Sequence, residues 1–206
     1  MYSRRFVVAA ATVATVALAL AGCSTSDPLA EQYRSGTDQN YIAGDGSLLE
    51  IAQSNRGDVI VFEGVDEHGA AISSSDHLGE VLVVNFWASY CVPCRVEAPD
   101  LQALSEEWEG NGASFLGINT WDEPDTALAF SRTYGVTYPS VMDAASGTAQ
   151  LAFAGNVPPS ALPTTIVLDK QGRVAARILG QIKAKSILDS LIERVVNESD
   201  AAGSTG

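Results

Sequence analysis

The chain has 206 residues, of which 46% are apolar and 18% charged, and it contains only three cysteines. This composition is typical of a globular protein and excludes collagen, coiled coils, low-complexity disorder and disulfide-dense mini-proteins. The 25 acidic residues outnumber the 12 basic ones and give a net charge of −13. That charge argues against nucleic-acid binding, because phosphate backbones are bound by Lys and Arg.

The N-terminal segment has the pattern of an export signal. Two arginines precede an uncharged run over residues 6–21, which is shorter than the ~20 apolar residues that a membrane-spanning helix needs. The sequence LAGC at residues 20–23 resembles a bacterial lipobox. We therefore expect residues 1–22 to be a cleaved signal peptide and Cys23 to carry a lipid that anchors the protein to the extracytoplasmic face of the cell membrane. The alternatives are a plain signal peptide followed by an unrelated cysteine, or an uncleaved anchor.

The rest of the chain divides into a spacer, a folded domain and a tail. Residues 23–57 lack apolar periodicity and predict a spacer, although residues 41–42 and 48–51 are apolar enough to dock on the domain. Residues 58–196 form the expected domain, and residues 197–206 predict a disordered tail. The exported compartment is oxidising, so a cysteine pair in the domain is able to form a disulfide.

Within the domain, strands and helices alternate. A β-hairpin comes first, and the apolar run at residues 81–87 predicts a strand that is buried on both faces. The order of elements predicts an α/β fold, with a mixed central β-sheet flanked by helices on both faces and an N-terminal β-hairpin addition. The expected strands are 59–62, 70–72, 81–87, 114–119, 140–142, 164–168 and 173–179, and the expected helices are 93–109, 125–134, 148–153 and 184–196.

Two cysteines follow the central strand. Cys91 and Cys94 are separated by two residues at the start of the next helix, where unpaired N–H groups favour a thiolate at Cys91. Cys94 lies one turn inside the helix, so it is better placed to attack a mixed disulfide than to be attacked by a client protein. This arrangement predicts a redox-active pair.

Two other readings of the cysteine pair are weaker. A purely structural disulfide would stabilise the fold little, because stabilisation grows with the length of the closed loop and this loop is minimal. A zinc site needs four ligands, and beyond the pair the chain offers only His68, His77 and the lipid-bearing Cys23. We therefore expect no metal.

Two segments resemble a known family. Residues 83–99, VVNFWASYCVPCRVEAP, are similar to the active-site segment of the thioredoxin-like TlpA/ResA family. Leu162, Pro163 and Thr164 are similar to the family's cis-proline loop, which faces the cysteine pair and holds an extended client. The likeness covers nearly all of residues 58–196. It implies a thioredoxin-like fold and a thiol-disulfide oxidoreductase whose redox group is the cysteine pair, with no further cofactor.

The resemblance also implies roles for single residues. Cys91 is the expected nucleophile and Cys94 the resolving thiol. Glu97 matches the acidic residue of the family's CxxCxxE pattern and is a candidate base for the Cys94 proton. The alternative is that Glu97 is a surface residue whose charge only interacts favourably with the helix dipole. Tyr90 stands where the family usually has Trp, and Asn85 replaces the buried acid of general thioredoxins. The expected client-binding residues are Trp87, Tyr90, Pro93, Leu162, Pro163 and Thr164.

These features predict a membrane-tethered, extracytoplasmic thiol-disulfide reductase. The family suggests a role in c-type cytochrome maturation, with apocytochrome c thiols as clients and a membrane thiol carrier as electron donor. Val92 and Pro93 offer no group that stabilises a thiolate, so we expect a reduction potential nearer that of thioredoxin, roughly −270 mV, than that of DsbA, about −120 mV.

Other classes of function remain as alternatives. A disulfide oxidase or isomerase would use the same pair, and a non-catalytic binding lipoprotein would use the fold as a scaffold. A peroxiredoxin is disfavoured because Ala88 stands three residues before Cys91, where that class needs Thr or Ser. A copper chaperone is disfavoured because no histidine follows His77.

Overall fold

A computed structural model describes residues 41–42, 46–158 and 161–198 of the chain. The expected signal peptide, the lipidation site at Cys23 and residues 199–206 of the expected tail lie outside the described residues. The expected tail begins two residues too early, because Glu198 is ion-paired with Arg56. In the part of the chain that the structure describes, no helix combines the length and the apolar character needed to cross a bilayer.

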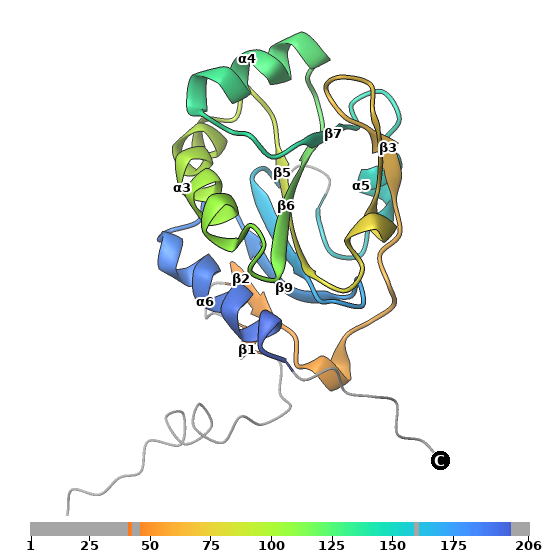
Figure 1. The fold of residues 1–206 in the computed structure, drawn as a ribbon, viewed down its shortest axis with the longest axis vertical. Coiled ribbons are helices and arrows are strands. Elements are labelled where there is room, and N and C mark those ends of the chain that lie inside the picture. Colours follow the sequence, from red (N-terminus) through yellow and green to blue (C-terminus); the bar gives the residue numbers. More distant parts are fainter. Residues whose placement is uncertain (1–40, 43–45, 159–160, 199–206) are drawn as a thin grey trace, which may run out of the picture. The chain divides into compact units, whose positions relative to one another are not determined.

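The centre of the fold is a mixed β-sheet (Figure 1). Within the described residues, seven strands pair in the order β1-β2-β9-β8-β5-β6-β7. β5 lies inside the sheet, between β8 and β6, because all of its residues but Asn85 are hydrophobic and it is buried throughout. It pairs in parallel with β6 and antiparallel with β8. The strands are β1 (Tyr41–Ile42), β2 (Leu48–Glu50), β5 (Val81–Trp87), β6 (Ala113–Asn119), β7 (Ser140–Met142), β8 (Thr164–Leu168) and β9 (Val174–Leu179).

Helices cover both faces of this sheet, as the sequence predicts. The helices are α3 (Val92–Trp108), α4 (Pro124–Tyr134), α5 (Thr148–Ala152) and α6 (Lys185–Val196). Alternate β5 side chains enter two separate cores. Val81 and Val83 pack with apolar residues of α3 and α6 on one face, whereas Val84 and Phe86 pack with Phe153 beside α5 on the other. The thioredoxin-like α/β fold is therefore confirmed.

The N-terminal hairpin is present but begins later than expected. Its strands are β3 (Glu63–Val65) and β4 (Ala71–Ser73), so the first strand does not occupy residues 59–62. The turn sets this register, because an Asp66 carboxylate oxygen accepts hydrogen bonds from the N–H groups of His68 and Ala70. The apolar run before β3 is used differently: Phe62 is buried in the core. Two short 3₁₀ helices, η1 (Gln53–Asn55) and η2 (Ser74–His77), lie in the connections.

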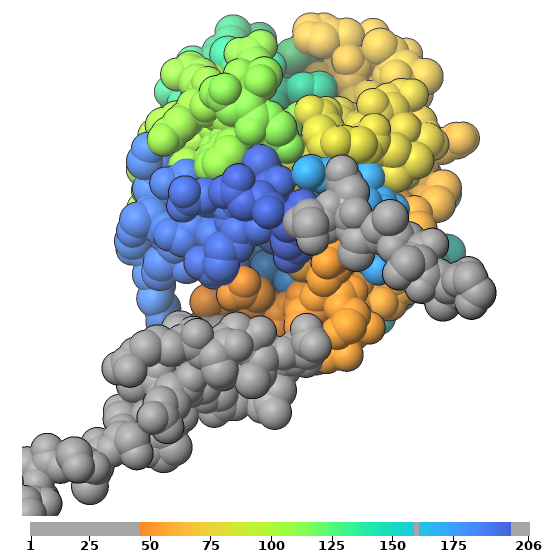
Figure 2. All heavy atoms as spheres, turned by 60° about the horizontal axis from the view of Figure 1, so that its bottom comes forward, coloured from red at the N-terminus to blue at the C-terminus, as the bar shows by residue number. Residues whose placement is uncertain are grey.

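Part of the expected spacer belongs to the sheet. β2 extends the sheet by pairing antiparallel with β9, and β1 pairs with β2. Figure 2 shows the part of this segment that contains β2, in orange, beside α6, in dark blue. The Arg194 guanidinium of α6 donates to the Glu50 carboxylate at 2.8 Å. The docking predicted for residues 41–42 and 48–51 is thus strand pairing.

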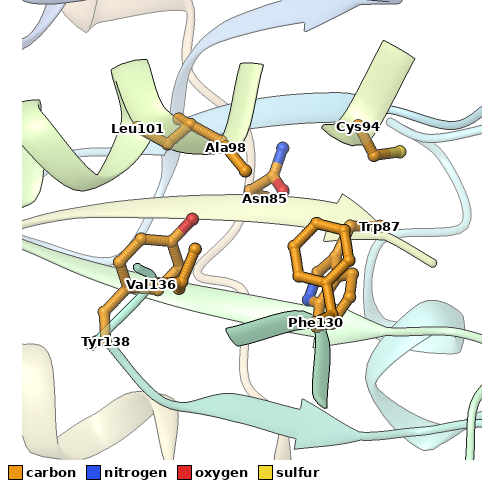
Figure 3. Close-up of a pocket in the computed structure, with 8 residues that line it drawn as sticks. All are labelled: Asn85, Trp87, Cys94, Ala98, Leu101, Phe130, Val136 and Tyr138. Atoms are coloured by element: carbon orange, nitrogen blue, oxygen red, sulfur yellow. The ribbon is translucent and has the colours of Figure 1, made fainter. Parts of the chain in front are cut away.

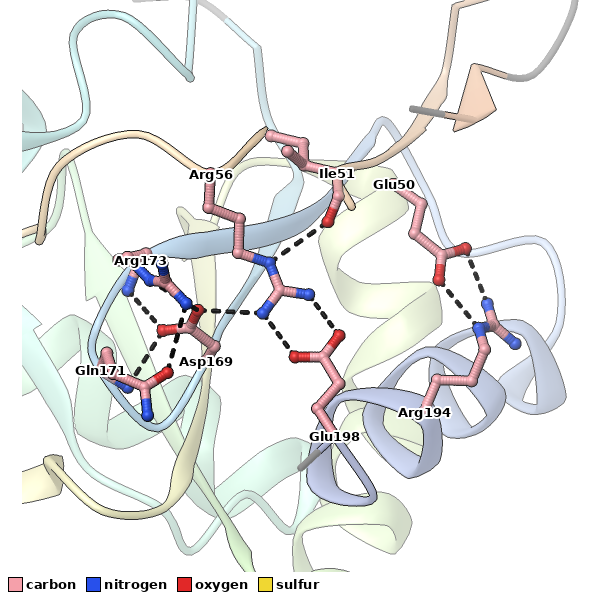
Figure 4. A network of polar contacts seen from close by, with 8 residues as sticks. All are labelled: Glu50, Ile51, Arg56, Asp169, Gln171, Arg173, Arg194 and Glu198. Atoms are coloured by element: carbon pink, nitrogen blue, oxygen red, sulfur yellow. Dashed lines mark hydrogen bonds and ion pairs between the residues drawn. The ribbon is translucent and has the colours of Figure 1, made fainter. Parts of the chain in front are cut away.

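A buried arginine fastens the same segment to the far end of the chain (Figure 4). The Arg56 side chain is 2% exposed, and its guanidinium pairs with the carboxylates of Asp169 and Glu198. Its Nε also donates to the carbonyl oxygen of Ile51 at 3.2 Å. Asp169, in the turn between β8 and β9, is shared with Arg173. Because Arg56 and Asp169 are buried and paired with each other, this cluster holds the N-terminal segment, the β8–β9 turn and the residues just after α6 together.

Candidate redox site

The cysteine pair lies where β5 gives way to α3. Cys91 and Cys94 form a disulfide. Cys91 caps the N-terminus of α3, and its Sγ accepts a hydrogen bond from the Cys94 N–H at 3.2 Å. Cys91 is 6% exposed and Cys94 2%. Since exchange requires access to a sulfur, the outer cysteine is the one that a client reaches more easily.

The cis-proline loop lies beside the disulfide. The Leu162–Pro163 peptide bond is cis, as the sequence predicts. β8 begins at the next residue, and its Thr164 pairs with Phe86 of β5, so the loop lies at the same end of the sheet as the cysteines. Leu162 packs against the apolar cluster that contains both cysteines. The Thr164 side chain is buried and donates to the Ala161 carbonyl oxygen, so it supports the loop rather than facing a client.

The two aromatic residues before the cysteines have different surroundings. The Trp87 indole is buried, packs on Phe130 with ring centroids 4.3 Å apart, and donates from Nε1 to Ser140 Oγ at 3.1 Å. Tyr90, in contrast, is 56% exposed next to Cys91. Pro93 lies in the first turn of α3 and is partly exposed. Of these expected client-binding residues, Tyr90 and Pro93 reach the surface, whereas Trp87 lies in the core beneath it.

Glu97 is a buried carboxyl group. Its side chain is 1% exposed, so the alternative of a surface glutamate is wrong. Its two oxygens accept hydrogen bonds from Asn85 Nδ2 and from the Ile182 N–H, both at 2.9 Å. Burial raises the pKa of Glu97 to about 7, against the lowering effect of these two donors. A group with this pKa exchanges a proton near neutral pH.

A small cavity is lined by the inner cysteine and by Asn85, the residue that donates to Glu97 (Figure 3). Cys94 lies at one end of it, and the Asn85 amide, which donates to Glu97, forms part of its wall. Burial raises the pKa of the Tyr138 hydroxyl on the opposite wall, so that hydroxyl stays protonated. The lining residues are Asn85, Trp87, Cys94, Ala98, Leu101, Phe130, Val136 and Tyr138.

Sequence reasoning missed a polar network that fixes the loops around the disulfide. The buried Asp122 carboxylate accepts from the Ser89 N–H and from Ser89 Oγ, each at 2.6 Å. Asn119 Nδ2 donates to the same carboxylate at 2.8 Å, and Asn119 Oδ1 accepts from the Asp122 N–H at 2.7 Å. The sequence does contain a signal for this network. The polar residues Asn119 and Asp122 lie at and just after the end of β6, which runs parallel to β5. Because the carboxyl ends of neighbouring parallel strands meet at one edge of a sheet, these residues lie near the loop that follows β5.

Comparisons with known proteins agree with this geometry. Residues 57–177 match the AhpC/TSA family. The thiol-disulfide oxidoreductase ResA of Geobacillus kaustophilus is 33% identical over 113 residues, which are 55% of this chain and 62% of that relative. The matched region therefore spans less than two thirds of the length of this curated relative.

Solved structures match over nearly their full length. A secreted thiol-disulfide isomerase from Corynebacterium glutamicum has a TM-score of 0.68 and 35% identity, over 78% of this chain and 98% of that one. A DsbF homologue from Corynebacterium diphtheriae has a TM-score of 0.65 and 32% identity, over 77% and 99%. The chain therefore belongs to the AhpC/TSA family and is, within it, a thioredoxin-like protein of the ResA type, the group whose curated members are named thiol-disulfide oxidoreductases.

Proposed function

We propose that this protein is an extracytoplasmic thiol-disulfide reductase that a lipid on Cys23 tethers to the membrane. The observation that carries the proposal is the Cys91–Cys94 disulfide at the N-terminus of α3, with the cis-proline loop beside it. A pair so placed closes by exchange with a client disulfide and opens again by exchange with a donor dithiol, without any further cofactor. The names of the relatives support the same chemistry.

The proposed reaction transfers two electrons from the protein to a client disulfide. The Cys91 thiolate attacks one client sulfur and forms a mixed disulfide, and the other client sulfur leaves as a thiolate. The Cys94 thiolate then attacks Cys91 Sγ, which closes the protein disulfide and releases the second client thiolate; both client thiolates take up protons. Glu97, hydrogen-bonded to the Asn85 amide in the wall beside Cys94, is our candidate acceptor for the Cys94 proton.

We expect the direction of electron flow from the groups near Cys91. Beyond the Cys94 N–H, which donates to Cys91 Sγ, the two residues between the cysteines do little to stabilise a Cys91 thiolate. Val92 has no polar side chain, and Pro93 has no N–H to offer. Arg95 directs its Nε to the Ser89 carbonyl oxygen at 2.7 Å. We therefore expect a midpoint nearer to about −270 mV than to about −120 mV in a titration of the purified full chain against dithiothreitol or glutathione buffers. A midpoint above about −180 mV would refute the reductase direction.

Disulfide isomerisation is the second candidate, because the similar Corynebacterium glutamicum protein is described as an isomerase. The two functions differ in what they need. An isomerase restores scrambled client disulfides without a net supply of electrons, whereas a reductase stops after one turnover unless a donor reduces it again. Refolding of a scrambled disulfide protein with catalytic amounts of the chain, with and without added dithiol, separates them.

The proposed clients are apocytochrome c thiols that have become oxidised, with a membrane thiol carrier as the donor. This part of the proposal rests on the resemblance to the TlpA/ResA family. A Cys94→Ser chain should retain clients as mixed disulfides on Cys91, which a dithiol releases, and the double variant that also lacks Cys91 should retain none. Recovery of proteins without haem-binding cysteine pairs would contradict the cytochrome assignment.

The lipid tether is tested separately from the chemistry. Cys23→Ala should release the protein from membranes or leave it unprocessed, because the modified thiol is the proposed attachment point. Fractionation of cells that express either form, followed by detection of the chain, gives the result. Equal membrane retention of a signal-cleaved Cys23→Ala protein would contradict the tether.

A further inference from the structure

Two exposed aromatic rings lie next to the disulfide. Tyr90, which precedes Cys91, is 56% exposed, and Trp121, in the loop between β6 and α4, is 69% exposed. Their ring centroids are 5.7 Å apart in an edge-to-face arrangement. We call these two residues the aromatic pair. Its rings contribute little to the core, because more than half of each side chain faces solvent.

The backbone under the aromatic pair is held firmly. Ser89, just before Tyr90, is bound through its N–H and its hydroxyl to the buried Asp122 carboxylate. The Trp121 N–H donates to Asn119 Oδ1 at 3.1 Å. A polar network thus fixes both loops, while the rings that they carry remain open to solvent. Aromatic side chains presented in this way lose little entropy on binding and often dominate interface energies.

We infer that the aromatic pair binds an apolar or aromatic side chain of the client, within two residues of the client cysteine. The mixed disulfide places that cysteine on Cys91, and an extended chain advances about 3.3 Å per residue, so its neighbours reach Tyr90. Glu123 and Asp125 are exposed just after Trp121, and the chain carries a net charge of −13. Acidic client segments are therefore disfavoured.

This inference rests on the proposed role of Cys91 as the client-facing sulfur, but not on the direction of electron flow. It is tested with the reduced full chain and three short peptides, each with one cysteine linked as a mixed disulfide to thionitrobenzoate. The peptides carry Phe, Ser or Glu beside the cysteine. Attack by the Cys91 thiolate joins the peptide sulfur to Cys91 and releases the coloured thionitrobenzoate anion, so absorbance reports the rate.

The wild-type chain should react about tenfold faster with the Phe peptide than with the Ser peptide, which corresponds to ~1.4 kcal/mol, and slowest with the Glu peptide. Trp121→Ser should remove most of the preference for Phe, so that the Phe and Ser peptides react at similar rates. Trp121→Phe should keep most of the preference. Leu151→Ser is the matched control, because Leu151 is 74% exposed on α5 and should have no effect.

Equal wild-type rates with the Phe and Ser peptides would overturn the inference and leave the proposed function standing. So would a Trp121→Ser chain that slows with every substrate alike, or a Leu151→Ser chain that loses the same preference. A wild-type chain that reacts with Ellman's reagent but with no peptide would instead overturn the proposed function together with the inference.

Discussion

Replacing Glu97 with glutamine should remove a pH dependence of stability that the buried carboxyl creates. The pKa of Glu97 is raised from 4.5 to about 7, chiefly because the group is buried. One pKa unit corresponds to about 1.36 kcal/mol. Ionising this carboxyl in the folded chain therefore costs about 3 kcal/mol relative to the unfolded chain.

The sign follows from proton binding. Between pH 4.5 and about 7 the folded chain keeps a proton on Glu97 that the unfolded chain has lost. The free energy of unfolding therefore falls as the pH rises through this window. The stabilising contribution is complete below pH 4.5 and is lost once the pH has passed about 7. Glutamine stays neutral, so Glu97→Gln lacks this slope, although one altered hydrogen bond costs it a constant ~1 kcal/mol.

Urea denaturation of the two oxidised full-length chains at a series of pH values measures this effect. The difference in unfolding free energy should shift by about 2.5 kcal/mol in favour of Glu97→Gln between about pH 5 and about pH 9. Other titrating groups cancel in the difference. Glu193→Gln, at an exposed position of α6, is the matched control and should show no such shift. A difference between wild type and Glu97→Gln that is constant with pH would refute a raised pKa at Glu97.

The remaining predictions concern the thiols, the core below them and the buried arginine. In the reduced chain near neutral pH, iodoacetamide should label Cys91 before Cys94, as mass spectrometry of timed samples would show; the reverse order would contradict the assigned roles. Gly117→Ala should cost ~1–3 kcal/mol in urea denaturation, because a Cβ there would lie 2.2 Å from Ser140 Oγ and 2.8 Å from Trp87 Nε1. Arg56→Met should cost about 3 kcal/mol in the same assay, because it leaves the buried Asp169 carboxylate with fewer partners. A cost below about 1 kcal/mol would show that the cluster does not fasten the N-terminal segment.

The fold and the cysteine pair could be predicted because their signals are local. The mostly apolar run of β5, the spacing of Cys91 and Cys94 and the proline before β8 each lie within a few residues of the feature that they produce. The hairpin start was misplaced for the same reason, since the apolar run at residues 59–62 has the local pattern of a strand. In the structure, Phe62 of this run is buried in the core, and the Ile60 N–H donates to the Gly172 carbonyl oxygen in the β8–β9 turn.

Features that depend on distant partners could not be predicted. The surroundings of Glu97 depend on the N–H of Ile182, which is 85 residues away in the chain. Arg56 stands in a polar stretch typical of a spacer, and its partner Glu198 is 142 residues away. The strand character of β2 likewise depends on β9. The exposure of Trp121 has no local signal in the sequence, because tryptophan side chains are on average highly buried.

The position of the Arg56 cluster also affects how the domain resists a pulling force on the chain. It lies by the turn that follows Leu168, which pairs with Leu82 at the beginning of β5, whereas the disulfide follows Trp87 at the other end of that strand. The length of β5 separates the two by roughly 20 Å. A pull on the chain from its N-terminal side therefore meets the β1–β2 and β2–β9 ladders first and the Arg56 ion pairs next, before it reaches the cysteines.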